Sequence, residues 1–191
     1  YYGWAKHNQQ GLLPSRKQVE DAERVTNEFR SRHKGSMDVF FVAPDYYDDR
    51  PKKCSNGWAT TFITVTPEGD VLPCHAAKVI PGLDFPNVKQ HKLSDIWQSS
   101  DLFNKYRGTS WMVEPCASCP ERMIDLGGCR CQALMLTGDA ANADPVCSLS
   151  PFHDRVTKIT DRASGEFDSN EPVPLLFRNM KNAEQFNQDQ S

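Results

Sequence analysis

Seven cysteines carry the clearest chemistry in this sequence of 191 residues. Two stand alone, four form a cluster and one follows: Cys54, Cys74, Cys116, Cys119, Cys129, Cys131 and Cys147. An odd number spaced this unevenly is atypical of a secreted disulfide scaffold, which is usually smaller and pairs its cysteines. In a reducing compartment, grouped cysteines are more often metal ligands, and thiolates suit iron–sulfur clusters or zinc. We therefore expect a cytoplasmic metalloprotein.

Seven thiolates are one donor short of filling two four-ligand sites. Asp125 lies between the Cys116-x2-Cys119 pair and the two later cysteines of the cluster, and its carboxylate is the candidate for the eighth donor. The alternative is that Asp125 is a turn residue before Gly127. Spacing alone leaves both interpretations open.

The elements that position the donors can be predicted from local patterns. Residues 60–65 and 71–72 are predicted to form a hairpin, which folds Cys54 back toward Cys74. Gly69 supplies the backbone freedom that its turn needs. Beyond the hairpin, short helices are predicted over 93–98, 100–106 and 132–137, and the cysteine cluster is predicted to lie in loops.

The N-terminal region predicts a different structure. Ser15 and Gln18 form a capping-box pattern at the start of a helix that ends before Gly35. Its apolar residues recur at three- and four-residue steps and predict one apolar face: Val19, Ala22, Val25 and Phe29. Residues 39–43 are predicted to be a buried strand. A helix feeding a buried strand is typical of an α/β layer.

We divide the chain into 1–50, the end of an α/β domain, 51–150, the cysteine-bearing domain, and 151–191, a polar tail that forms an extended or partly mobile arm after about Asp161. The chain begins in an apolar stretch without an initiator Met, so we expect the intact protein to extend upstream. No apolar run reaches the ~20 residues that span a bilayer. The net charge is −3 and the basic residues are scattered, which argues against nucleic-acid and membrane partners.

The cysteine array, with Gly69 shortly before Cys74, resembles the SPASM auxiliary-cluster domain of radical SAM enzymes, although that family has a cysteine where Asp125 stands. Short sequence words within the chain are more specific and resemble the radical SAM enzymes of pyrroloquinoline quinone (PQQ) biosynthesis. These words are Tyr2-Gly3-Trp4-Ala5, Val71-Leu72-Pro73-Cys74-His75-Ala76-Ala77, Trp111-Met112-Val113-Glu114-Pro115-Cys116, Gly127-Gly128-Cys129-Arg130-Cys131-Gln132-Ala133 and Leu136-Thr137-Gly138-Asp139.

The resemblance implies an α+β chain, in which the end of a partial (β/α) radical SAM barrel precedes a SPASM domain with a hairpin, short helices and cysteine-rich loops. It implies two auxiliary iron–sulfur clusters of the [4Fe–4S] or [2Fe–2S] type. The family pattern assigns Cys54, Cys74, Cys129 and Cys131 to the first cluster. It assigns Cys116, Cys119 and Cys147 to the second, with Asp125 in the place of the fourth ligand.

Enzymes of this family cleave S-adenosylmethionine (SAM) and join a glutamate carbon to a tyrosine ring carbon in a ribosomal precursor peptide. The resemblance therefore implies a PqqA-like peptide, a PqqD-like peptide chaperone and a flavodoxin-type reductant as partners.

One departure from the family is that this sequence lacks the CxxxCxxC motif of the SAM-cleaving cluster. We expect that third [4Fe–4S] cluster and the SAM site in a preceding segment, and we expect the chain alone to be inactive. Two alternatives remain: a stand-alone iron–sulfur electron-transfer module and a zinc-stabilised interaction domain.

Overall fold

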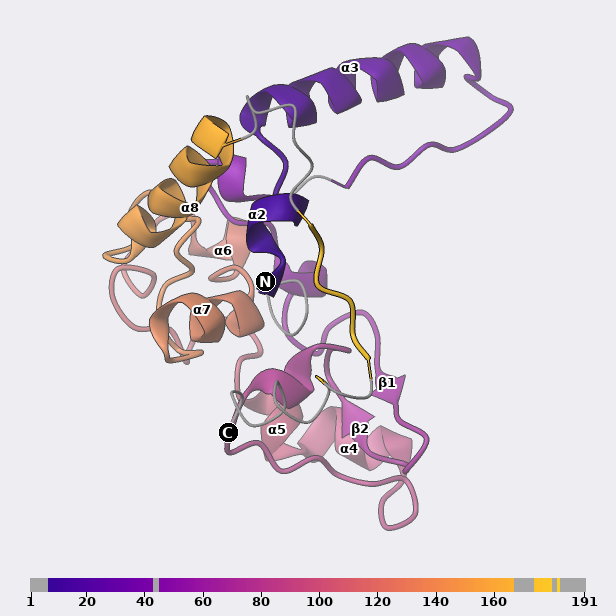
Figure 1. Ribbon diagram of the computed structural model, residues 1–191. Helices are drawn as coiled ribbons and strands as arrows, with labels where there is room; N and C mark the ends of the chain where they lie inside the picture. The colour runs from indigo at the N-terminus through magenta and orange to yellow at the C-terminus, as the bar shows by residue number, and fades with distance from the viewer. Residues whose placement is uncertain (1–6, 43–44, 167–173, 180–181, 183–191) are drawn as a thin grey trace. The chain divides into compact units, whose positions relative to one another are not determined.

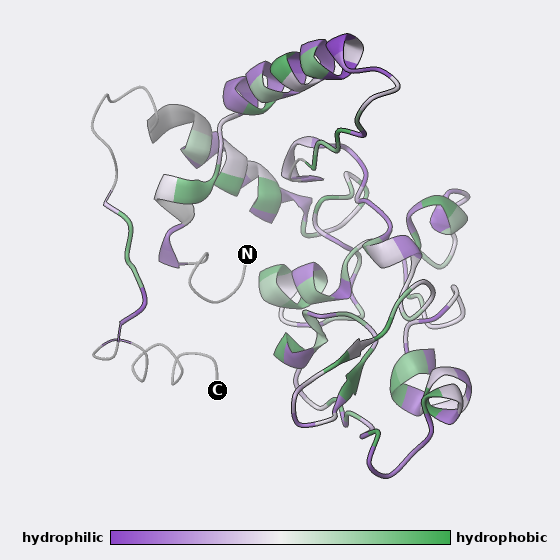
Figure 2. Cartoon of the chain, turned by 90° about the vertical axis from the view of Figure 1, so that its right-hand side faces the viewer, coloured by the Kyte–Doolittle hydropathy of each residue, from purple (hydrophilic) through white to green (hydrophobic). Residues whose placement is uncertain are grey.

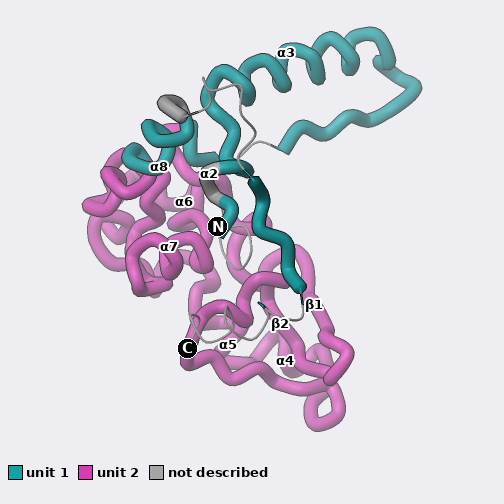
Figure 3. The backbone as a smooth tube through the Cα atoms, viewed as in Figure 1, with its two compact units in different colours: residues 1–47, 157–191 teal, residues 48–156 magenta. Residues whose placement is uncertain are grey.

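The computed structural model describes residues 7–42, 45–166, 174–179 and 182 (Figure 1). The chain divides into two compact units (Figure 3). One comprises residues 1–47 and 157–191, and the other comprises residues 48–156. All seven cysteines belong to the second unit.

The first unit contains α2 (Gln9–Leu12), α3 (Arg16–Arg32), the 3₁₀ turn η1 (Asp45–Tyr47) and the larger part of α8 (His153–Glu166). The predicted capping box at the start of α3 is confirmed. The Gln18 N–H donates to the Ser15 Oγ at 3.3 Å, and the Ser15 N–H donates to the Gln18 Oε1 at 2.8 Å. The helix ends at Arg32, shortly before the predicted stop at Gly35.

The predicted apolar face of α3 is present in the sequence but is not buried. Polar and apolar residues alternate along this helix (Figure 2), yet none of its residues is buried, and Val25 is 52% exposed. The prediction of a buried strand over 39–43 is wrong for residues 39–42, while Ala43 lies outside the described residues. Phe40 is 86% exposed, and no strand pairs with this segment in the described part of the chain. A strand needs such a partner for its backbone groups.

The second unit is built around the predicted hairpin. Strands β1 (Thr64–Val65) and β2 (Val71–Leu72) pair antiparallel, with Thr64 opposite Leu72 and Val65 opposite Val71. Gly69 closes the turn at φ +98°, a left-handed conformation that glycine adopts without a steric penalty. The first strand is shorter than predicted, since only Thr64 and Val65 of the described segment 60–65 pair with β2, while the Thr60 and Thr61 hydroxyls donate to the carbonyls of Gly57 and Ser55.

The core of this unit packs the hairpin against two short helices, α4 (Leu93–Ser99) and α5 (Asp101–Asn104), close to the predicted helices. Figure 1 shows both helices beside the strands. The core members include Val71, Ile96 and Phe103, each at most 2% exposed. The Trp58 Nε1–H donates to the Leu102 carbonyl at 2.9 Å and ties the segment after Cys54 to this core.

The remaining short elements of the second unit carry or flank the cysteines. They are η2 (Cys54–Asn56), η3 (Ala77–Val79), α6 (Arg122–Asp125) and α7 (Arg130–Thr137). Helix α7 ends at Gly138 as predicted but begins earlier than predicted, so Cys131 lies on a helix and not in a loop.

The prediction of an extended arm directly after Asp161 is also wrong, since α8 continues to Glu166. Part of the residues beyond it lie outside the described ranges. Mixed short helices and a small sheet agree with the predicted α+β class, whereas the assignment of residues 1–50 to a barrel stays a prediction. Within the described residues, no helix has the length and apolar character required to cross a bilayer.

Candidate metal centre

Four thiols from distant parts of the chain meet in the second unit. Cys54 opens η2, Cys74 follows β2, and Cys129 and Cys131 lie at the start of α7. The Cys54 thiol contacts those of Cys74 and Cys129, and the Cys131 thiol contacts the same two. The four side chains therefore form a closed ring, which we call the first donor set.

Local structure places each member of this ring. The hairpin returns the chain from Cys54 to Cys74, as its turn predicts. The Cys131 Sγ lies 3.4 Å from the Ala76 carbonyl oxygen, which joins the start of α7 to the segment after β2. Cys74 and Cys131 are buried, whereas Cys54 and Cys129 are partly exposed. The ring thus has a closed side and a side nearer the surface.

The thiols of the first donor set share protons unequally. Hydrogen bonds from Cys131 and then Cys54 lower the pKa of Cys74 to about 3 and that of Cys129 to about 2. The same contacts raise the pKa values of Cys54, through Cys129 first, and of Cys131. The hydrogen bonds between these thiols thus favour the thiolate form at Cys74 and Cys129. Because thiolates are the metal-binding form, binding by all four would release the remaining protons.

The second donor set comprises Cys116, Cys119, Asp125 and Cys147. Burial raises the pKa of Cys116 to about 11, and the negative charges of Asp125, Cys147 and Cys119 also raise this pKa. Burial likewise raises the pKa of Cys147, and the charges of Asp125 and Cys119 also raise it. The four groups are thus close enough to influence one another. Their cysteines are partly exposed, so this set lies nearer the surface than Cys74 and Cys131.

Asp125 has the turn role that the sequence allows, and its role as an eighth donor stays a prediction. It is 9% exposed at the end of α6, and its Oδ1 accepts from the Gly127 N–H at 2.8 Å, as a turn aspartate does. This is the hydrogen bond that its side chain makes in the described part of the chain, and it uses Oδ1 and not Oδ2. The turn therefore fixes the carboxylate beside the three cysteines and leaves one oxygen for another interaction.

The donor chemistry of the first set fits an iron–sulfur cluster, because such clusters are held by four thiolates. The thiols contact one another directly, so they would have to move apart around a bound cluster. Within the described ranges, no three His, Cys, Asp or Glu side chains are spaced to hold a metal ion as they stand. The first donor set therefore fits a cluster in the type of its donors and in their meeting at one place, and not in their present spacing.

Asp144 is a positioning residue that sequence reasoning missed. Its Oδ2 accepts from the Cys129 N–H at 2.8 Å, and its carbonyl accepts from the Cys147 N–H at 3.0 Å. It is 1% exposed and also accepts from the Gln132 side chain at 2.9 Å. One residue therefore connects the backbones of both donor sets. Nothing in the sequence but its place before Pro145 marks it.

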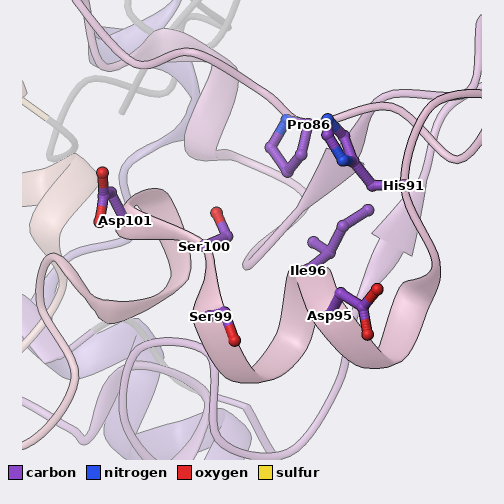
Figure 4. Close-up of a pocket in the computed structure, with 7 residues that line it drawn as sticks. All are labelled: Pro86, His91, Asp95, Ile96, Ser99, Ser100 and Asp101. Atoms are coloured by element: carbon purple, nitrogen blue, oxygen red, sulfur yellow. The ribbon is translucent and has the colours of Figure 1, made fainter.

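His75, which follows Cys74, lies outside the first donor set. It is exposed, and its ring stacks on that of Phe62 at 6.4 Å between centroids. A separate hollow of about 350 Å³ lies beside α4, between Pro86 and Asp101 (Figure 4). No cysteine lines it, so it is distinct from both donor sets.

Comparison with known proteins agrees with the cysteine pattern. Residues 54–120 match the SPASM family, described as an iron–sulfur cluster-binding domain. The chain is 56% identical over 161 residues to a PqqA peptide cyclase of Gluconobacter oxydans (strain 621H), covering 84% of this chain and 44% of that protein. It is 54% identical over 181 residues to a PqqA peptide cyclase of Bradyrhizobium diazoefficiens, covering 94% of this chain and 46% of that protein. The chain spans less than half the length of either relative.

Proposed function

Because this chain carries a SPASM iron–sulfur cluster-binding domain, we propose that it is the auxiliary-cluster portion of a radical SAM enzyme of PQQ biosynthesis. The observation that supports this proposal most strongly is the ring formed by the thiols of Cys54, Cys74, Cys129 and Cys131. These residues come from separate elements, and a structural core does not need four cysteines in mutual contact. Free thiols of this kind also suit a cytoplasmic enzyme.

In this proposal the first donor set holds one auxiliary cluster and the second holds another. The three cysteines of the second set are joined by the Oδ2 of Asp125, whose carboxylate is a harder donor than a thiolate. When bound, such clusters supply one-electron transfer at potentials set by their ligands and surroundings. The protein's part is to hold the donors, to orient the ligand loops through Asp144 and to limit access of water to Cys74 and Cys131.

The substrate of the whole enzyme is a PqqA-like precursor peptide, and the product carries a bond between a glutamate carbon and a tyrosine ring carbon. A PqqD-like chaperone presents the peptide, and a flavodoxin-type protein supplies electrons. The SAM-cleaving cluster and its CxxxCxxC motif, which these 191 residues do not contain, belong to another part of that enzyme. The names of the two relatives support the choice of peptide.

The test uses the full-length protein that contains this chain, with SAM, the precursor peptide, the chaperone and reduced flavodoxin. Mass spectrometry should show a peptide that has lost a pair of hydrogen atoms, with fragments that map the new bond to glutamate and tyrosine. Cys74→Ala should abolish this product. His75→Ala, next in sequence but outside the donor set, should retain it. An unchanged peptide in a reaction that cleaves SAM would overturn the proposal.

A further inference from the structure

Arg130 lies between two ligands of the first donor set and is the largest fully buried side chain among the described residues, at 1% exposure. Its Nη1 donates to the carbonyls of Ala140 at 2.7 Å and Asn142 at 2.9 Å, and its Nη2 donates to the carbonyl of Gly127. Its guanidinium also lies 4.5 Å over the ring of Trp111. This cation is therefore fixed within the loops that carry the ligands.

The Nε of this guanidinium is unused. In the described part of the chain, the Arg130 Nε is buried and has no hydrogen-bond partner. A buried N–H without an acceptor is destabilising, and native proteins rarely leave one unpaired without a reason. Both Nη nitrogens donate to carbonyls, whereas the Nε–H has no acceptor and is available to a group that the protein chain does not provide.

Arg130 contacts the loops of both donor sets. It lies between Cys129 and Cys131 of the first set, and its Nη2 donates to the carbonyl of Gly127, whose N–H donates to the Oδ1 of Asp125 in the second set at 2.8 Å. Charges interact strongly at such buried positions, because little water is present to screen them. A buried cation also needs compensating negative charge.

We propose that Arg130 is a positioning residue shared by the two cluster sites, where its fixed positive charge raises the reduction potential of both clusters and its Nε–H donates to a cluster sulfur. Reduction adds one electron to a cluster, and a nearby cation stabilises the reduced form more than the oxidised form. Hydrogen bonds to the sulfurs and the net charge around a cluster are established controls of its potential. This inference rests on the proposed function, because it requires bound clusters.

The test compares Arg130→Gln, which removes the charge, with Arg130→Lys, which keeps it. Each protein is loaded with iron and sulfide anaerobically, and its midpoint potentials are measured by dithionite titration followed by electron paramagnetic resonance. We expect Arg130→Gln to lower the equilibrium constant for reduction of both clusters at least tenfold, which is about 59 mV for one electron. Arg130→Lys should remain closer to the unchanged protein.

Arg107 offers a matched control. Its guanidinium stacks on Trp97 at 5.3 Å and donates to the carbonyls of Ala59 and Trp97, which are the same two kinds of contact that Arg130 makes. Arg107→Gln should leave both potentials unchanged. A similar shift in Arg107→Gln, or equal shifts in Arg130→Gln and Arg130→Lys, would assign the effect to packing and overturn the inference.

Cluster content separates the possible failures. If the unchanged protein binds no cluster, the proposed function fails. If it binds clusters and Arg130→Gln has unchanged potentials, only the role of Arg130 fails. Should Arg130→Gln bind no cluster, retention of both clusters by Arg130→Lys would support the need for charge, and loss from both variants would overturn it.

Discussion

Replacing Gly128 by alanine tests how the loop before Cys129 is held. Gly128 adopts φ +73°, and an added Cβ would lie 2.5 Å from the Asp144 Oδ2, 2.7 Å from the Asp144 Cβ and 2.8 Å from the Pro51 Cβ. Real Cβ atoms do not approach other atoms this closely. Two of these three atoms are close to the backbone, so a side-chain rotation cannot relieve the clash. The loop itself must move.

The expected loss of stability has two parts. A left-handed conformation costs a residue with a Cβ about 1–2 kcal/mol, and overpacking costs about 1–3 kcal/mol more. Gly128→Ala should therefore destabilise the chain by roughly 2–5 kcal/mol. Because Asp144 must shift, the hydrogen bond from the Cys129 N–H should also weaken and iron uptake by the first donor set should fall.

Gly108 supplies the control, because it has nearly the same φ, +71°, with no atom within 4 Å of an added Cβ. Gly108→Ala should incur the backbone part alone, about 1–2 kcal/mol. Urea unfolding of both variants measures the difference, with iron analysis after anaerobic loading as a second readout. Equal unfolding midpoints and equal iron contents in the two variants would refute the close packing of Gly128 on Asp144.

Three further substitutions test the two donor sets and the residue that connects them. Cys74→Ala should remove the first cluster and about half of the bound iron, since four thiolates are needed to hold it; full iron content would contradict that assignment. Asp125→Cys should slow the removal of iron from the second cluster by a chelator, because a thiolate binds iron less exchangeably than a carboxylate, and an unchanged rate would exclude Asp125 as a ligand. Asp144→Asn should weaken iron binding about tenfold or more by loosening the loops of both sets, as competition with a chelator would measure; unaltered binding would deny Asp144 its positioning role.

Local signals predicted several elements well. The capping box of Ser15 and Gln18, the turn at Gly69 and the helix end at Gly138 each depend on neighbouring residues, and all three are present. The predicted strand is absent over residues 39–42, because an apolar run becomes a strand only beside a pairing partner. The apolar face of α3 also has the predicted periodicity but is not buried, because burial depends on a second element that packs against it.

In the candidate site, too, features set by neighbouring residues were predictable, and features set by contacts between distant residues were not. The types and spacing of the cysteines are visible in the sequence, and the hairpin explains why Cys54 and Cys74 approach each other. The roles of Asp144 and Arg130 depend on contacts made through the folded loops. The buried aspartate that accepts from the Cys129 N–H has no periodicity or motif that would reveal it. Arg130 is marked in the sequence by its place between Cys129 and Cys131, but its burial and its unpaired Nε are visible only in the structure.

The most direct test of the account is the metal and sulfide content of the chain purified and loaded without oxygen, read with Mössbauer spectroscopy. The account predicts a brown protein with about eight irons and matching sulfide for two [4Fe–4S] clusters, or about six if one cluster is [2Fe–2S]. Cys74→Ala and Cys116→Ala should each remove a different part of the spectrum. A colourless protein that holds about two zinc ions and no sulfide would contradict the account.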